Sequence, residues 1–367
     1  MFAIGFIAAL AVAAAFDEEP AGVVPAEMCG TYFIVSVVLE SESGKPEADR
    51  TLDFIYDTGA SGSLVDPDSI ERVSGVRVPV GKRAVFRNAS AGDVSYNKLP
   101  ARVGEFDHIS RALGRPVDGL LAYDAFGPYL VTLDYEAGEI RLGRGELPKP
   151  DGKTVFNARG KDERPWVKVK LGGRRERLLV DSGARNAVAV NDLDKYEVVG
   201  EPAPLGAAIR IKRIEKRVGA RLAGSLNFGD VTFDRPIAEK TPGNQLLGAQ
   251  VLQHFEITLD NKNRRIRFIQ RTPGRLTSPP RRETGAFMKP TDEGFEIFDI
   301  VEGSAAADAG LEVGDVLTAF DGAPAFERGC PRRRDGIDER PAEIVLTRSR
   351  DDEEQDVRLD LSEPVIP

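Results

Sequence analysis

This chain carries the same short phrase of sequence twice. Residues 54–65 read FIYDTGASGSLV, and residues 178–190 read LLVDSGARNAVAV. Each copy places an aspartate after an apolar run and follows it with a hydroxyl residue, glycine and alanine. Asp57 and Asp181 stand 124 positions apart, a spacing far longer than the repeats of stacked solenoids. The duplication therefore predicts two similar lobes, each of which delivers one carboxylate on a tight turn.

Later landmarks in the two halves keep nearly the same spacing. Leu120 and Leu246 are 126 positions apart, and Asp134 and Asp260 are separated by the same 126. The second pair stands in the turn of a hairpin pattern whose flanks are rich in β-branched residues. Residues 166–171, WVKVKL, alternate apolar and basic side chains as a half-buried strand does. Helical signals are short and few, so we predict a mainly β chain.

The repeated D-[ST]-G-A phrase, together with an apolar-apolar-glycine step in the second half of each lobe, resembles the retropepsin-like aspartic proteases in a single-chain form. The resemblance covers about residues 30–272. It implies two similar closed β lobes of acid-protease type that form a cleft, with Asp57 and Asp181 side by side as the catalytic pair. One departure is Ala122, which stands where the first lobe should have the glycine of that step.

The resemblance also implies supporting roles around the pair. The hydroxyls of Thr58 and Ser182 are expected to bond across to the opposite loop, and Gly59 and Gly183 are expected to shape the turns. Two carboxylates in contact cannot both ionise cheaply, so such a pair holds one proton over a wide pH range. The ionised member can activate a water that attacks a peptide carbonyl, while the protonated member donates to the oxyanion. This chemistry needs no cofactor and no metal, and the sequence does not assign the two roles.

We therefore predict an aspartic-type endopeptidase, a hydrolase that acts on protein or peptide substrates. The alternative is a catalytically inactive protease-like protein that serves as a peptide-binding or scaffold protein. In that case Arg185 and Ala122 would be substitutions that accompanied the loss of activity. The presence of both aspartates, both hydroxyl residues and both glycines favours the enzyme. Because two lobes in one chain complete the site, a monomer suffices.

Three further residues are expected to contact substrate: Ser61, Arg185 and Tyr96. Arg185 stands in the second lobe where the first has Ser61. Either it biases the site toward acidic substrates or lowers the pKa of the pair, or its side chain points to solvent or forms an ion pair. A third alternative is a drifted second lobe with weak or no activity. Residues 88–96 are the best candidate for a flap, with Tyr96 closing on the substrate; an ordinary surface hairpin is the alternative.

Residues 294–325 closely resemble a PDZ domain of the bacterial type, through GFEIFDIVEGSAAADAGLEVGDVLTAFDGAPA. The resemblance implies a small C-terminal α+β domain that binds an extended peptide by adding it to a sheet edge. The groove would be bordered by Gly294, Phe295, Glu296 and Ile297. Residues 328–339 are polar and rich in arginine and aspartate where a groove helix usually lies, so a structural add-on is the alternative to a working peptide receptor.

The chain is divided into a signal peptide (1–16), a first aspartic-protease lobe (17–150), a second lobe (151–270), a Pro/Arg-rich linker (271–282) and a PDZ domain (283–367). The apolar start ends in three alanines, which predicts export to the periplasm or secretion, or a membrane anchor if the segment is not cleaved. Cys29 and Cys330 could pair in an oxidising compartment, although their spacing does not require it.

Charge and histidine content exclude other partners. The formal net charge of −9 argues against nonspecific nucleic-acid binding, so we expect no nucleic-acid partner. The arginines between residues 264 and 282 are interpreted as a solvated connection rather than a nucleic-acid patch. His108 and His254 lack the spacing of a zinc site, and we predict no metal.

Overall fold

The computed structural model describes residues 19–40, 44–211, 213–271, 274–327, 329–330, 341–351 and 353–367. The predicted signal peptide lies outside these residues, as does most of the arginine-rich segment 328–339. The described chain is mainly β with short helices, as predicted. None of its helices is both long and apolar enough to span a bilayer.

The first lobe is a closed barrel. Its strands are β2 (Glu27–Cys29), β3 (Tyr32–Leu39), β4 (Thr51–Asp57), β5 (Leu64–Val65), β6 (Arg83–Ala91), β7 (Val94–Val103) and β8 (Gly119–Ala122). They are hydrogen-bonded in the order β2-β3-β4-β8-β5-β7-β6, and a further β3–β6 pairing closes the sheet. The short helices are η2 (Glu47–Arg50), α1 (Pro67–Ser74) and α2 (Asp107–Leu113). The α1 helix begins where the Asp66 side chain accepts a hydrogen bond from the Asp68 N–H, and it ends at Gly75, whose φ is 72°.

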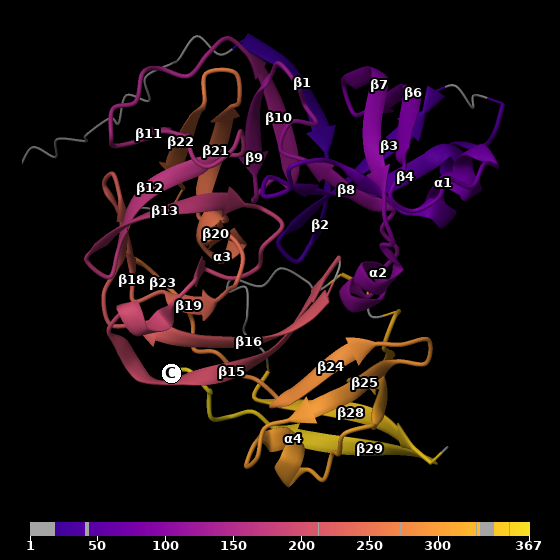
Figure 1. Ribbon diagram of the computed structural model, residues 1–367, viewed down its shortest axis with the longest axis vertical. Coiled ribbons are helices and arrows are strands. Elements are labelled where there is room, and N and C mark those ends of the chain that lie inside the picture. Colours follow the sequence, from indigo (N-terminus) through magenta and orange to yellow (C-terminus); the bar gives the residue numbers. More distant parts are fainter. Residues whose placement is uncertain are drawn as a thin grey trace, which may run out of the picture.

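The second lobe is an open sheet. Its strands are β12 (Trp166–Leu171), β13 (Arg174–Asp181), β14 (Val188–Val190), β15 (Val198–Arg210), β16 (Arg213–Leu222), β17 (Leu226–Phe228), β18 (Val231–Asp234), β19 (Ile237–Lys240), β20 (Leu246–Gly248) and β23 (Leu276–Thr277). Two short helices, η3 (Leu193–Lys195) and α3 (Ala249–Leu252), accompany them. The order is β15-β16-β19-β14-β20-β13-β12-β17-β18-β23. The prediction of two closed lobes is therefore wrong for this lobe, because its end strand β15 runs out toward α2 instead of returning to the sheet (Figure 1).

In both lobes the aspartate ends a strand and lies beside the last residue of the apolar-apolar-glycine step, which is alanine in the first lobe. Asp57 on β4 is in register with Ala122 on the parallel strand β8, and Asp181 on β13 is in register with Gly248 on β20. A β-carbon at Gly248 would overlap the backbone carbonyl of Asn186, so that position requires glycine. The Ala122 methyl is instead fully buried in the first lobe. The predicted duplication is thus reproduced in the strand pairing.

A six-stranded sheet joins the two lobes. It has the order β1-β10-β9-β21-β22-β11. Its strands are β1 (Glu19–Pro25), β9 (Leu130–Asp134), β10 (Glu139–Arg144), β11 (Val155–Asn157), β21 (Phe255–Asp260) and β22 (Arg265–Gln270). At its centre the antiparallel strands β9 and β21 place Thr132 opposite Thr258, and their buried hydroxyls lie 2.9 Å apart. The two halves of the repeat therefore share one continuous sheet and one hydrophobic core.

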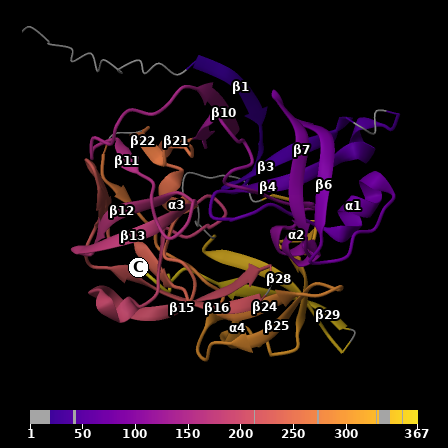
Figure 2. The ribbon, with the colours of Figure 1, turned by 45° about the horizontal axis from the view of Figure 1, so that its top comes forward.

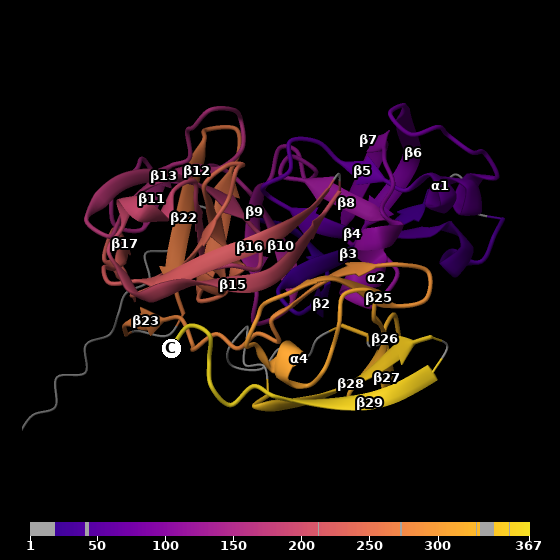
Figure 3. The same cartoon turned by 60° about the horizontal axis from the view of Figure 1, so that its bottom comes forward.

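A third domain lies against both lobes (Figure 3). It contains β24 (Ala286–Pro290), β25 (Phe295–Ile300), β26 (Val316–Phe320), β27 (Ala323–Pro324), β28 (Glu343–Arg350), β29 (Glu353–Asp360) and the helix α4 (Ala305–Asp308). The domain has its own core, built around Ile297, Leu317 and Leu346. In Figure 2 it approaches α2, and Arg111 of that helix donates to the Asp292 carboxylate at 2.6 Å.

The segment between the second lobe and the third domain is packed. Leu276–Thr277 forms β23 beside β18, and the Arg221 guanidinium donates to the carbonyl oxygens of Ser278 and Pro279, each at 3.1 Å. Arg281 is buried and forms an ion pair with Glu283 at 2.6 Å. The interpretation of a solvated connection is therefore wrong at this arginine.

Cys29 and Cys330 form a disulfide, with their Cα atoms 4.6 Å apart. Sequence spacing left this pairing open. The bond ties β2 of the first lobe to the third domain, across 301 positions of chain. Cross-links that close long loops restrict the unfolded chain, so the disulfide stabilises the attachment of the third domain.

Replacing Cys29 with serine should lower the free energy of unfolding by about 2–4 kcal/mol, measured by denaturant titration without reductant. Reductant should lower the stability of the wild type toward that of Cys29→Ser and leave the variant unchanged. Two titratable thiols in unfolded, unreduced wild type would contradict the pairing.

Candidate active site

The repeated phrases form two matching turns that face each other. Each follows directly from a buried strand, β4 or β13, that ends at the aspartate. The N–H of Gly59 donates to Oδ1 of Asp57 at 2.8 Å, and the N–H of Gly183 donates to Oδ1 of Asp181 at 2.9 Å. Each carboxylate is thereby oriented by the turn of its own phrase.

The two carboxyl groups are in direct contact. A hydrogen bond between them contributes to the pKa of both Asp57 and Asp181. A β-carbon at Gly59 would overlap the carboxyl group of Asp181, and one at Gly183 would overlap that of Asp57. Both glycines are therefore required by the close approach of the opposite acid. The prediction that the repeat brings two acids together is confirmed.

Reciprocal hydrogen bonds lock the two turns. The N–H of Thr58 donates to the Ser182 hydroxyl, and the N–H of Ser182 donates to the Thr58 hydroxyl, each at 3.0 Å. The Thr58 hydroxyl donates to the carbonyl of Val180, and the Ser182 hydroxyl donates to the carbonyl of Tyr56, each at 2.8 Å. Both hydroxyl residues are fully buried. The predicted crossing of the hydroxyls is confirmed.

Burial raises the pKa of both aspartates. Desolvation is the largest cause for each; for Asp181 the neighbouring charge of Asp57 adds to it, and the pKa rises well above its usual range. The rise at Asp57 is opposed by the Gly59 N–H, by the contact with Asp181 and by the charge of Arg164. Both residues keep some accessible surface, but the surrounding protein is dense enough for desolvation to dominate. The pair therefore holds a proton at pH values where an isolated aspartate is ionised.

Arg164 is a residue of the site that sequence reasoning missed. Its guanidinium donates to the Gly59 carbonyl at 2.5 Å, so a second-lobe side chain holds the first-lobe turn. Only 14% of the side chain is exposed. No local motif marks it, because its acceptor is a backbone atom 105 positions away.

Arg185 lies at the edge of the site beside Tyr32. Desolvation is the main cause that raises the Tyr32 pKa, while the charge of Arg185 opposes the rise and the charges of both aspartates add to it. Arg185 is half-buried and has no ion pair or hydrogen bond within the described residues. Ser61, its counterpart, is exposed. Whether either residue contacts substrate stays a prediction.

The predicted flap does not hang over the aspartates. The tip of the β6–β7 hairpin is fixed to β1, because the N–H of Asp93 donates to the Val23 carbonyl at 3.0 Å and the Asp93 carboxylate accepts from the Val23 N–H at 2.8 Å. Tyr96 packs against the hydrophobic core, close to Tyr56 and Tyr129. Its side chain is therefore committed to packing, and the ordinary-hairpin alternative describes residues 88–96 better.

A different hairpin bridges the lobes beside the pair. β15 and β16 extend from the second lobe toward α2 (Figure 1). At the tip, Ile211 packs with a first-lobe cluster that includes Ala60 of the turn that carries Asp57. The carbonyl of Arg210 lies 3.0 Å from Nε2 of His108, and Arg210 is near enough to oppose the rise in the Asp181 pKa. Sequence reasoning missed this hairpin as well.

The predicted peptide-binding residues lie inside the third-domain sheet. Phe295 and Ile297 are buried in its core, and Glu296 forms an ion pair with Lys289 at 2.9 Å. The backbone of Phe295 and Glu296 pairs with β24 on one side and β26 on the other. A β-carbon at Gly294 would overlap the Leu317 carbonyl. The strand edge that peptide addition requires is therefore occupied at these residues.

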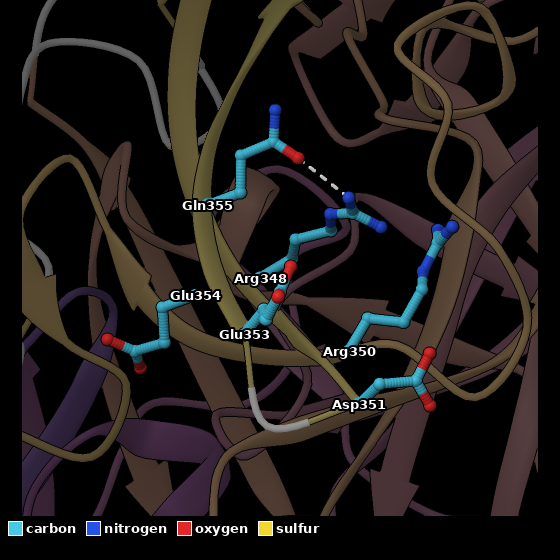
Figure 4. Close-up of a pocket in the computed structure, with 6 residues that line it drawn as sticks. All are labelled: Arg348, Arg350, Asp351, Glu353, Glu354 and Gln355. Carbon is cyan, nitrogen blue, oxygen red and sulfur yellow. Dashed lines mark hydrogen bonds between the residues drawn. The ribbon is translucent and has the colours of Figure 1, made fainter.

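A surface depression of about 430 Å³ lies on the β28–β29 hairpin of the third domain, and neither aspartate lines it (Figure 4). It is lined by Arg348, Arg350, Asp351, Glu353, Glu354 and Gln355. Its arginines already have partners, since Arg348 donates to Gln355 at 2.6 Å and Arg350 pairs with Asp315 at 2.5 Å. We therefore place the candidate site at the carboxyl pair. No group of histidine, cysteine or acidic residues in the described chain is arranged to hold a metal.

No protein-family model and no curated protein sequence matches this chain. Among solved structures, an aminopeptidase N family protein from Idiomarina loihiensis is similar over 24% of this chain, with 25% identity and a TM-score of 0.18. The chain spans 15% of that protein's length. A similarity of this extent carries no argument about fold or function.

Replacing Thr58 with valine should lower the free energy of unfolding by about 1–3 kcal/mol, because the buried Ser182 N–H and Val180 carbonyl lose their partner. Denaturant titration checks this. The control is Thr232→Val, whose hydroxyl donates to the Asn227 side chain and, among the residues described, bonds to no backbone group. An equal effect of the two substitutions would contradict the importance of the crossing.

Replacing Asp181 with asparagine should stabilise the fold near neutral pH. Ionising a carboxyl group whose pKa is raised in the folded state costs the fold stability. This cost is absent below the unfolded pKa, where the group is protonated in both states, and it grows as pH rises toward the folded pKa. The gain should therefore be present at neutral pH and vanish as pH falls toward 3.8. Thermal unfolding of both proteins across pH measures it. A gain that persists at low pH would contradict the raised pKa.

Proposed function

We propose that this protein is an aspartic-type endopeptidase. The observation that carries the proposal is the direct contact of Asp57 with Asp181, from two copies of one turn, under reciprocal buried hydrogen bonds. Such a pair retains one proton where isolated carboxyl groups are ionised. Such a pair can hold one water molecule between a base and an acid, each within hydrogen-bond reach, as hydrolysis of an amide requires.

The reaction needs only the pair and water. The carboxylate removes a proton from water as the water oxygen bonds to the peptide carbonyl carbon. The carbonyl oxygen takes the proton of the other aspartate, which gives a neutral gem-diol. The C–N bond then breaks, the amine takes the proton from the first aspartate, and a gem-diol hydroxyl returns its proton to the second. Both aspartates end as they began.

The wider architecture supports the same proposal. We assign the two lobes and their joining sheet to the acid-protease type and the third domain to the PDZ type, on the sequence resemblance. The substrates would be proteins or peptides. A disulfide that forms between Cys29 and Cys330 is consistent with export, the predicted location.

Wild type should cleave an unstructured protein such as casein at some pH between about 3 and 7, the range in which coupled carboxyl groups exchange one proton. Asp57→Asn and Asp181→Asn should each lose at least about a hundredfold in rate, because each removes one member of the acid–base pair. Cleavage followed by mass spectrometry measures both.

The matched control is Asp118→Asn, a first-lobe aspartate that bonds to Ser69 and Arg72 rather than to the pair. It should retain cleavage if the protein is folded. Wild type that cleaves no better than the two dyad variants at every pH would overturn the enzyme and leave the inactive, peptide-binding protein.

A further inference from the structure

The two lobes carry different residues at one equivalent position next to the pair. Ile34 pairs with Ile55 and Trp166 pairs with Leu179, and each of these partners stands two residues before its aspartate. Counting back two residues from Ile34 and from Trp166 gives the equivalent positions 32 and 164. The first lobe therefore has tyrosine, and the second lobe has arginine, at the same place in the repeat.

Arg164 uses this position to reach the opposite turn. It donates to the Gly59 carbonyl at 2.5 Å, and its guanidinium is held by Asp162 through Nε at 3.1 Å and Nη2 at 2.5 Å. Asp162 in turn accepts from the indole N–H of the buried Trp166 at 2.9 Å, and the Arg164 guanidinium lies 5.9 Å from the centre of that ring. The cation is thus fixed on several sides.

Tyr32 makes no corresponding bond. No side chain in the described residues donates a hydrogen bond to the Gly183 carbonyl, which is the counterpart of the Gly59 carbonyl. The turn that carries Asp57 is therefore braced by a buried cation, and the turn that carries Asp181 is not. The turn of the first carboxyl group therefore has the guanidinium of the Arg164–Asp162 ion pair bonded to it.

Other charged and titratable groups also surround the pair. Arg210 acts on Asp181 from the β15–β16 tip, and Arg185 and Arg217 act on Tyr32. Tyr56 lies on the core side of Asp57. Arg210 is about half-exposed, whereas Arg164 is largely buried. Asp162 pairs with the Arg164 guanidinium and offsets part of its charge. Solvent screens an exposed charge more strongly than a buried one, and Arg164 bonds directly to the Asp57 turn, so Arg164 is the cation on which the asymmetry rests.

We propose that Arg164 is a positioning residue that makes Asp57 the general base and Asp181 the general acid of the pair. This inference rests on the proposed function. A cation favours the ionised form of the carboxyl group nearer to it, so the shared proton resides on Asp181. Burial raises the pKa of both aspartates, and the charge of Arg164 opposes that rise at Asp57.

The assignment fixes the path of each proton. Asp57 removes the proton from water, and Asp181 gives its proton to the carbonyl oxygen. After the C–N bond breaks, Asp57 has passed its proton to the amine and Asp181 has recovered one from the gem-diol. Asp57 is again ionised and next to the cation.

Two reagents distinguish a carboxylate from a carboxylic acid without any turnover. A small aryl epoxide is opened by an ionised carboxylate, whose oxygen bonds to the epoxide carbon while the alkoxide takes a proton from water. A diazoacetyl ester takes the proton of a carboxylic acid, loses nitrogen and leaves an ester. In wild type the epoxide should modify Asp57 at least about tenfold more than Asp181, and the diazo reagent should show the reverse preference by the same factor. Tenfold is the ratio that one unit of difference in pKa gives.

Arg164→Gln should reduce both ratios toward one, and Arg164→Lys should restore most of the selectivity because it keeps the charge. The control Arg177→Gln removes an exposed charge on β13 and should leave the ratios unchanged. Peptide mapping after digestion reads the modified residue. If Arg164→Gln does not fold, the wild-type and Arg164→Lys ratios still test the assignment.

Equal labelling of the two aspartates, preference of the epoxide for Asp181, or labelling of neither would overturn the proposal, as would an unchanged ratio in folded Arg164→Gln. Selective labelling without any peptide cleavage would instead retain the asymmetry and count against the proposed function alone. If the protein cleaves peptides, the acid limb of the pH–rate profile should move to higher pH in Arg164→Gln, because the base loses the charge that favours its ionisation.

Discussion

The structure depends on the hydrogen bonds that Thr58 and Ser182 exchange across the lobe interface. Each hydroxyl accepts a hydrogen bond from a backbone N–H of the opposite turn. It also donates one to a backbone carbonyl of the strand that leads into that opposite turn. All four bonds are buried, so losing one partner leaves a polar group without water to replace it. The geometry of the two carboxyl groups is therefore fixed by the assembly of both lobes, and neither lobe defines it alone. The continuous sheet through Thr132 and Thr258 holds the lobes in the same relation.

The residues that sequence could predict are those whose partners are copies of the same phrase. Asp57, Thr58 and Gly59 each meet the second copy, so finding the repeat was enough to expect the contact. Arg164 could not be found this way, because a hydrogen bond to a backbone carbonyl leaves no trace in the sequence of the acceptor. Its position becomes visible only when strand register aligns it with Tyr32. The open sheet of the second lobe was not predicted for a related reason, since nothing in the composition of β15 indicates that this strand extends away from its lobe.

The third domain contacts the parts of the protein that surround the site. On β16, Lys216 forms an ion pair with Asp299 and lies 5.1 Å from the centre of the Phe287 ring. On α2, Arg111 bonds to Asp292. The same domain thus touches the β15–β16 hairpin of the second lobe and the helix of the first lobe against which that hairpin rests. Its position against the two lobes follows from these contacts, whatever its own sheet edges bind.

The disulfide makes a closed covalent ring of nearly the entire molecule. Cys29 and Cys330 are separated by 301 positions, and both aspartates and every strand of the second lobe lie between them. A single backbone cut anywhere within the ring therefore cannot release a fragment, because the two pieces remain tied through sulfur. Under the proposed function, a cut that the protein makes in one of its own loops would leave the two lobes at high effective concentration and able to stay associated.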